Sequence, residues 1–125
     1  MEIEFIRKRA EDFLRTSKYH FKERMYHLVA FDLEQALQLY LKYFLFLKTK
    51  HYPPTHSLKE LLRLVGKAYN VKKEVSKLIS NHIHLINDLE EAYISSRYLP
   101  AEFTKEQVKN MAQFVFEVIR FLKKL

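Results

Sequence analysis

The scarcity of glycine and proline is the feature that most constrains the fold of this chain. One glycine and three prolines occur among 125 residues. Both residue types interrupt helices, so their scarcity predicts long helices joined by few tight turns. The sequence shows no strand-type alternation of apolar and polar residues. The length is that of one domain, so we expect residues 1–125 to form a single all-α domain.

Apolar residues at helical spacing predict five helical segments. Expected ranges are 2 to about 15, with a break at Thr16-Ser17, then about 18–50, a short helix from Ser57 to Gly66, about 70–97 beginning near Asn70, and a last helix from Thr104. Ser57 to Glu60 and Thr104 to Gln107 have the form of capping boxes. The expected architecture is an antiparallel up-and-down four-helix bundle with one additional short helix.

The second segment is apolar on nearly every side in its later part, AFDLEQALQLYLKYFLFLK. Such a helix needs more than one neighbour, so it lies either at the centre of the bundle or in a dimer interface. The second reading leads us to expect a homodimer. Its most apolar stretch, residues 39–47, contains Lys42 and is far shorter than the roughly 20 residues of a membrane span. We therefore expect a cytoplasmic protein without a membrane partner.

The charge balance and the absence of cysteine bound the function. Without cysteine, disulfides, zinc-thiolate sites and cysteine nucleophiles are excluded. Twenty-two basic residues against 15 acidic ones give a net charge of +7. A basic surface favours polyanionic partners such as nucleic acid, nucleotides or an acidic protein. Because the basic residues are scattered along the chain, a lysine-rich surface that serves only solubility is an equal alternative.

Few residues form a pattern that is typical of chemistry. His20, Glu23 and His27 could share a helix face, but no metal motif is completed, and we expect no metal and no cofactor. His56 precedes the third helix, where it either bonds the backbone or meets a ligand. Arg97 offers planar, bidentate binding to phosphate. Further cations that could approach phosphate are Lys42, Lys48, Lys50 and Arg63.

Three stretches together resemble the HEPN domain, named for higher eukaryotes and prokaryotes nucleotide-binding. They are FDLEQALQLYLKYFLFL, PPTHSLKELL and AYISSRYLPAEFTKEQV, which follow the order of the family's elements over nearly the whole chain. The resemblance implies a four-helix bundle with a short extra helix that is usually a homodimer. It also implies a prokaryotic protein encoded beside a minimal nucleotidyltransferase, for which such proteins were proposed as the substrate-binding subunit. Other members of the family are metal-independent ribonuclease toxins that use an Arg and a His with four to six residues between them.

This sequence departs from the ribonuclease pattern because no histidine follows Arg97. The one formal match, Arg15 to His20, lies at the junction of the first two helices and is the candidate catalytic pair of the alternative reading. The resemblance makes Lys42, His56, Arg97 and Tyr98 the candidate ligand-binding residues. In a purely structural reading, Arg97 pairs with a carboxylate such as Glu34, and Tyr98 packs under the last helix.

The resulting hypothesis is a non-catalytic module that binds nucleotide or a partner protein. It would serve as the substrate-binding subunit of a minimal nucleotidyltransferase, in a toxin–antitoxin pair, with nucleotide and RNA as candidate ligands. The alternatives are a ribonuclease toxin and a purely structural or regulatory dimeric partner.

Overall fold

The computed structural model describes residues 2–98 and 102–125, except for the side chains of Glu2, Ser96 and Arg97. These residues form α-helices and contain no strand, as the sequence predicts. In chain order the helices are α1 (Glu2–Lys22), α2 (Tyr26–Thr49), α3 (Leu58–Ala68), α4 (Lys72–Asn81), α5 (Ile83–Tyr98) and α6 (Lys105–Lys123). None of these helices combines the length and the apolar character needed to cross a membrane.

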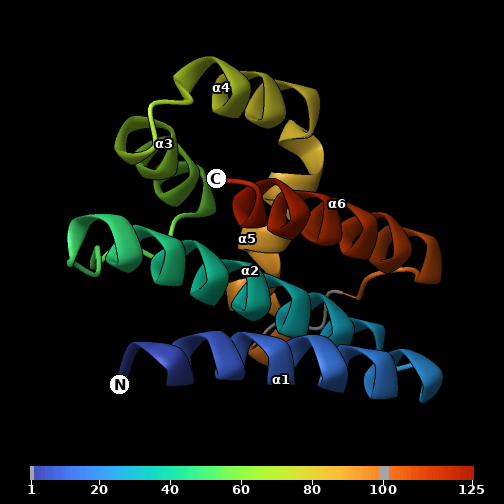
Figure 1. The fold of residues 1–125 in the computed structure, drawn as a ribbon. Coiled ribbons are helices and arrows are strands. Elements are labelled where there is room, and N and C mark those ends of the chain that lie inside the picture. Colours follow the sequence, from blue (N-terminus) through green and yellow to red (C-terminus); the bar gives the residue numbers. More distant parts are fainter. Residues whose placement is uncertain (1, 99–101) are drawn as a thin grey trace.

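α2 lies at the centre of the helical bundle. It packs against α1, α3, α5 and α6, and its side chains at Leu33, Leu37 and Leu41 are fully buried. Figure 1 shows α2 running between α1 and α6, with α5 behind it. α3 and α4 lie at the top of the view, on the side of α2 away from α1. Of the two readings of this apolar helix, the bundle centre is therefore the correct one. One chain covers α2, so α2 gives no reason for a second copy to dock.

The first helix is longer than the sequence suggested, and the expected break at Thr16-Ser17 is wrong. Both hydroxyl groups donate to carbonyl oxygens of the preceding turn, Thr16 to Asp12 at 2.8 Å and Ser17 to Leu14 at 2.6 Å. This bonding lets serine and threonine stay inside a helix. The chain turns instead after Lys22, where Arg24 has a left-handed backbone with φ 60°.

α3 does not end at Gly66, and Asn70 ends α3 instead of beginning the next helix. Asn70 has a left-handed backbone with φ 58°, and the Val71 N–H donates to the Gly66 carbonyl at 2.8 Å. This is the pattern of a Schellman-type helix end, in which asparagine tolerates the left-handed conformation. Gly66 is needed for close packing, because a Cβ there would lie 3.2 Å from the Val75 Cβ on α4. The absent side chain lets α3 and α4 approach each other.

The single helix expected over residues 70–97 is two helices, α4 and α5, that meet at His82. In a continuous helix the His82 N–H would donate to the Leu78 carbonyl. Here the imidazole Nδ1 bonds that carbonyl at 3.0 Å, and the backbone N–H donates to Ile79 at 3.2 Å instead. The His82 ring also packs on Phe114 of α6, with ring centroids 4.9 Å apart. A side chain that replaces a backbone donor thus ends α4 and redirects the chain.

The two predicted helix caps are both present, in different forms. Thr104 and Gln107 form the complete reciprocal capping box. Ser57 accepts from the Glu60 N–H at 3.2 Å, but its own N–H donates to Thr55 Oγ1 at 3.1 Å. The Thr55 hydroxyl thus takes the place that the capping box assigns to the Glu60 side chain.

Candidate functional site

A polar cluster with a buried centre on α2 connects α2, the segment before α3, and α5. Gln38 on α2 is its centre, since the Gln38 Nε2 donates to Glu34 Oε2 at 2.8 Å and the Gln38 Oε1 lies 3.0 Å from His56 Nδ1. An amide oxygen only accepts, so the His56 Nδ1 carries the proton. The His56 ring also faces Tyr93 of α5, at 5.4 Å between ring centroids. We call Glu34, Gln38, His56 and Glu90 the polar cluster.

Glu34 is the most strongly perturbed acid of the polar cluster. Its residue is fully buried, and burial raises the pKa of its carboxyl to about 7. Amide donors from Gln35, at 2.7 Å, and from Gln38 oppose that rise in pKa, while the Glu90 carboxylate adds to it. Lys42 lies on the same helix, and burial lowers the pKa of its ammonium against the effect of Glu34. The Glu34 carboxyl therefore exchanges its proton near neutral pH.

Glu90 attaches α5 to the beginning of α3. Its Oε2 accepts from the Ser57 hydroxyl at 3.1 Å and from the Lys59 N–H at 3.2 Å, and the Lys59 Nζ lies 3.7 Å from the other oxygen. A carboxylate at a helix N-terminus is favoured by the free N–H groups there. All four residues of the polar cluster thus have partners from the protein itself, which is the arrangement of groups that hold a fold.

One buried polar atom remains without a partner among the described residues. The Ser95 hydroxyl on α5 is fully enclosed and makes no hydrogen bond. A buried hydroxyl in that state costs about 1–3 kcal/mol. No feature of the sequence singles out this position.

The predicted ligand-binding residues are only partly brought together. His56 lies in the polar cluster, and Lys42 lies close enough to Glu34 for their charges to interact. Tyr98, at the end of α5, has 72% of its surface exposed, and its packing under the last helix stays a prediction of the structural reading. The Arg97 side chain lies outside the described residues, so its pairing with Glu34 stays a prediction.

The candidate catalytic pair, Arg15 and His20, does not form one site. Arg15 is exposed and pairs with Asp12 on its own helix. His20 is half-buried, and its Nδ1 lies 2.6 Å from Oδ2 of the buried Asp32 on α2. Five residues along a helix turn the chain by about 140° beyond one full turn, so the two side chains leave α1 in different directions. Arg15 thus forms an ion pair within α1, and His20 connects α1 to α2.

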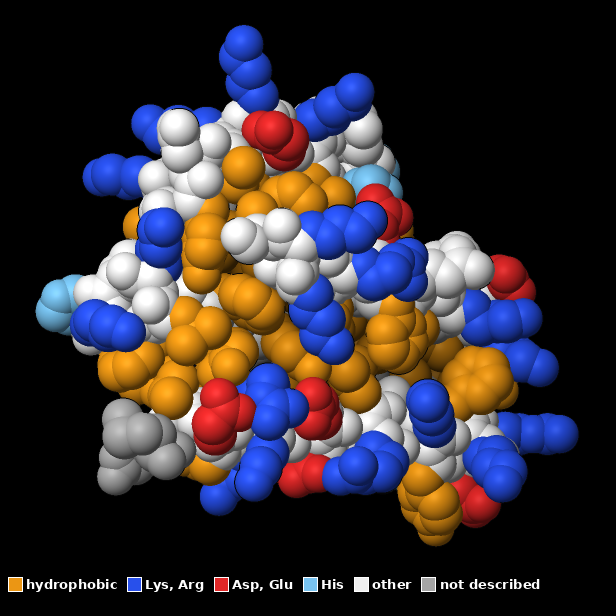
Figure 2. All heavy atoms as spheres, in the orientation of Figure 1, with side chains coloured by type: hydrophobic (Ala, Val, Ile, Leu, Met, Phe, Trp, Pro, Cys, Tyr) orange, Lys and Arg blue, Asp and Glu red, His pale blue; other side chains and the backbone are white. Residues whose placement is uncertain are grey.

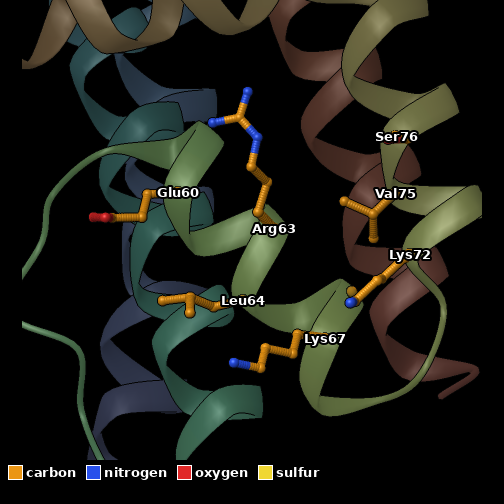
Figure 3. Close-up of a pocket in the computed structure, with 8 residues that line it drawn as sticks. Glu60, Arg63, Leu64, Lys67, Lys72, Val75 and Ser76 are labelled. Carbon is orange, nitrogen blue, oxygen red and sulfur yellow. The ribbon is translucent and has the colours of Figure 1, made fainter.

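A second candidate site is a basic crevice between α3 and α4, which we define by Arg63, Lys67 and Lys72. These three exposed residues line a cavity of about 350 Å³ together with Glu60, Leu64, Gly66, Val75 and Ser76. In Figure 3, Arg63 extends upward from α3, Lys67 leads to the left, away from α4, and Lys72 reaches from α4 toward α3. The close packing at Gly66 holds the two helices together at this point.

The three cations of the basic crevice have no carboxylate partner among the residues that the structure describes. Exposed Arg and Lys side chains around one concavity attract anions such as phosphate, although the acidic Glu60 also lines this cavity. Arg63 was among the cations that the sequence pointed to, whereas Lys67 and Lys72 were missed. The four-residue spacing of Arg63 and Lys67 puts both on one face of α3, and only the turn at Asn70 adds Lys72.

A second cavity lies on the other side of α3 and shares Leu64 and Lys67 with the basic crevice. Its volume is about 570 Å³, and its other walls come from the end of α2 and from the segment that contains Tyr52, Pro53 and Pro54. Lys67 therefore stands between a charged concavity and an apolar one. A ligand with a flat apolar part and a charged part would find both within reach of this lysine.

Comparison with known proteins gives a family and no individual relative. A model of the HEPN domain matches residues 3–125, nearly the entire chain. No match was found among curated proteins or among solved structures. The family includes nucleotide-binding and ribonuclease-type modules, and it has both catalytic and non-catalytic members. Within the described residues, no group of three or more His, Asp or Glu side chains is arranged to hold a metal ion.

Proposed function

Because the chain belongs to the HEPN family, we propose that it is a non-catalytic module that binds a nucleotide by its phosphates. The observation that carries the proposal is the basic crevice, where Arg63, Lys67 and Lys72 surround one cavity without carboxylate partners among the described residues. Arginine and lysine bind phosphate through charge-assisted hydrogen bonds. The net charge of +7 adds a long-range attraction for any polyanion.

The proposed partner is a minimal nucleotidyltransferase, as in a toxin–antitoxin pair, to which this chain would present the nucleotide. Two observations support a non-catalytic role in such a pair. Arg15 and His20 point in different directions and are engaged by Asp12 and Asp32. The titratable groups of the polar cluster, Glu34, His56 and Glu90, are bonded to the protein itself, which supports a structural role for them.

The proposal assigns different roles to the four family-typical residues. We place His56 and Lys42 in the fold, because His56 bonds Gln38 and Lys42 is half-buried beside Glu34. Tyr98 and its neighbour Arg97 are proposed to contact a partner. Ile94 lies one turn before Tyr98 and is 58% exposed, so the two form an apolar strip on α5. If two copies associate, we propose that this strip is their contact, since α2 is already covered.

Calorimetric titration with ATP at low ionic strength tests the nucleotide proposal. We expect the wild-type chain to bind ATP and to bind adenosine at least tenfold more weakly, because phosphate supplies most of the attraction. The double variant Lys67→Ala/Lys72→Ala should lose most of the ATP affinity and keep its melting temperature. Lys73→Ala/Lys77→Ala is the matched control. It also removes two exposed positive charges, both from α4, and neither lysine lines the crevice.

Three results would contradict the proposal. They are a wild-type chain that binds neither ATP nor other nucleoside triphosphates, equal loss of affinity in the two double variants, and RNA cleavage that both Arg15→Ala and His20→Ala abolish. The last result would establish the ribonuclease alternative instead.

A further inference from the structure

An open apolar groove crosses the face of the molecule shown in Figure 2. α1 and α6 both pack on α2, but no described Cα atom of α1 lies within 8 Å of a Cα atom of α6. A cavity of about 420 Å³ lies between them, with the α2 residue Val29 at its floor. Figure 2 shows apolar side chains gathered in a band between α1 and α6, with lysine and arginine side chains beside it. The apolar lining consists of Phe21, Val29, Val108, Ala112 and Phe116.

Two contacts between cations and aromatic rings lie near the two ends of α6. The Lys105 Nζ lies 5.9 Å from the centroid of the Phe21 ring, and the Lys123 Nζ lies 5.8 Å from the centroid of the Tyr40 ring. The cavity itself is lined by α6 from Val108 to Phe116, a rise of about 12 Å at 1.5 Å per residue, so it takes about two turns of a docked helix. A helix of about 18 residues, about 27 Å long, would also reach both lysines.

The edges of the groove are basic. Lys18 and Lys109 line the cavity, and Lys105 and Lys123 continue the row on α6. Within the described residues none of these four lysines pairs with a carboxylate. The acid beside Tyr40 is Glu11, and it is already engaged by Arg7 at 2.8 Å and by the Tyr40 hydroxyl at 3.1 Å. The free charge along the groove is therefore positive.

We propose that this groove receives an amphipathic helix of a different protein, with an apolar face flanked by aspartate and glutamate. Apolar residues at i, i+3, i+4 and i+7 would cover the Phe21, Ala112 and Phe116 side chains, and the flanking carboxylates would meet the four lysines. A second copy of this chain is the less suitable occupant, because its own groove would bring lysines against lysines in a protein of net charge +7. No residue of the basic crevice lines the groove, so the two surfaces act independently.

The test uses two synthetic 18-residue helical peptides with identical leucine and phenylalanine positions. One carries glutamate and the other lysine on both flanks of the apolar face, and fluorescence anisotropy measures binding to the intact chain. We expect the acidic peptide to bind at least tenfold more tightly, with an affinity that falls as salt rises. The exposed double variant Lys18→Glu/Lys109→Glu should remove this preference, because two lysines and two glutamates then flank the groove. Ala112→Arg, which places a long side chain in the groove, should abolish binding by the acidic peptide.

Lys73→Glu/Lys77→Glu makes the same charge change on α4 and is the matched control, so it should leave the preference unchanged. Circular dichroism and thermal melting check that each variant is folded, and the surface reversal keeps the test valid if Ala112→Arg does not fold. The proposal is overturned if neither peptide binds the wild-type chain, if both bind it equally, or if the control removes the preference as well. It is also overturned if the chain is a dimer in sedimentation and Ala112→Arg makes it a monomer, since a second copy would then fill the groove.

Discussion

The polar cluster and the basic crevice are both built from polar and charged side chains. Those of the cluster are bonded within the fold, whereas those of the crevice are exposed to water. In the polar cluster, Glu34 and Gln38 are buried and bond each other, and the exposed His56 bonds Gln38. In the basic crevice, Arg63 and Lys67 are exposed, and neither forms an ion pair with a carboxylate among the described residues. A buried polar group must find its partners inside the fold, whereas an exposed cation is stable with water as its partner.

The two regions are therefore expected to matter for different properties, one for stability and the other for binding. Removing a member of the polar cluster leaves another buried group without a partner, so the cost appears in the free energy of unfolding. Removing an exposed cation changes that free energy little and alters only what the surface attracts. The polar cluster is thus expected to control stability and the basic crevice to control affinity, and the following experiments test that division.

The largest expected effect is that of Gln38→Ala. The substitution removes the acceptor of the His56 Nδ1 proton and a donor to the buried Glu34 at once. We expect a loss of about 4 kcal/mol in the free energy of unfolding, because the buried Glu34 carboxyl loses a donor, which costs about 1–3 kcal/mol, and truncation of the buried Gln38 side chain leaves a cavity that adds about 1 kcal/mol. Urea denaturation measures it. A loss below about 1 kcal/mol would show that the network adds little to the fold.

The next effect is a dependence of stability on pH that originates at Glu34. Its carboxyl has a pKa of about 7 in the folded chain against 4.5 without perturbation, so between those pH values the folded state binds more protons than the unfolded state. Stability from this group is therefore full below about pH 4.5 and falls as pH rises through 7, by about 3 kcal/mol.

Glu34→Gln should remove this dependence, because glutamine does not titrate. Denaturation at several pH values gives the difference between the wild-type and variant profiles, which isolates Glu34 from the other acids. Glu91→Gln, at an exposed position of α5, is the control and should leave the profile unchanged. An unchanged profile in Glu34→Gln would show that Glu34 ionises in the folded chain at the same pH as in the unfolded one.

The two members of the ribonuclease-like pair should behave differently as well. His20→Ala leaves an oxygen of the buried Asp32 without its partner, and we expect a loss of about 2 kcal/mol in the free energy of unfolding. Arg15→Ala breaks only an exposed ion pair and should cost less than about 0.5 kcal/mol. Thermal melting of both variants measures the contrast. Equal losses would mean that the two residues act together.

The last expected effect concerns affinity alone. Lys67→Ala should weaken ATP binding about tenfold, which is about 1.4 kcal/mol, with the melting temperature unchanged. Calorimetry at two salt concentrations should also give a shallower salt dependence for the variant than for the wild type, because one phosphate contact is lost. A lower melting temperature with unchanged affinity would place Lys67 in the fold.

The sequence predicted the helical class because apolar periodicity and the scarcity of glycine and proline act locally. Helix ends were less predictable wherever a side chain competes for a backbone group. Thr16 and Ser17 bond backward and keep α1 intact, whereas the imidazole of His82 replaces its own N–H and divides the expected fourth helix. In the sequence, Gly66 suggests the end of a helix. In the structure, it lies inside α3 and allows close packing against Val75 of α4.

The candidate sites show the same limit. His56 stood out because it precedes a capped helix, yet its partner Gln38 lies 18 residues earlier and no sequence pattern links them. Lys67 and Lys72 belong to different helices and come together only through the turn at Asn70. Local chemistry can be predicted from sequence, whereas a site built from several helices depends on their packing.

Nuclear magnetic resonance of the isotope-labelled chain during titration with ATP tests the division between the two regions most directly. The account predicts that amide signals of Arg63, Lys67, Lys72 and Ser76 shift in a saturable manner, while those of Gln38, His56 and Tyr93 stay in place. Shifts centred on His56 and Tyr93, with α3 and α4 unaffected, would show that the polar cluster binds the ligand and would contradict the account.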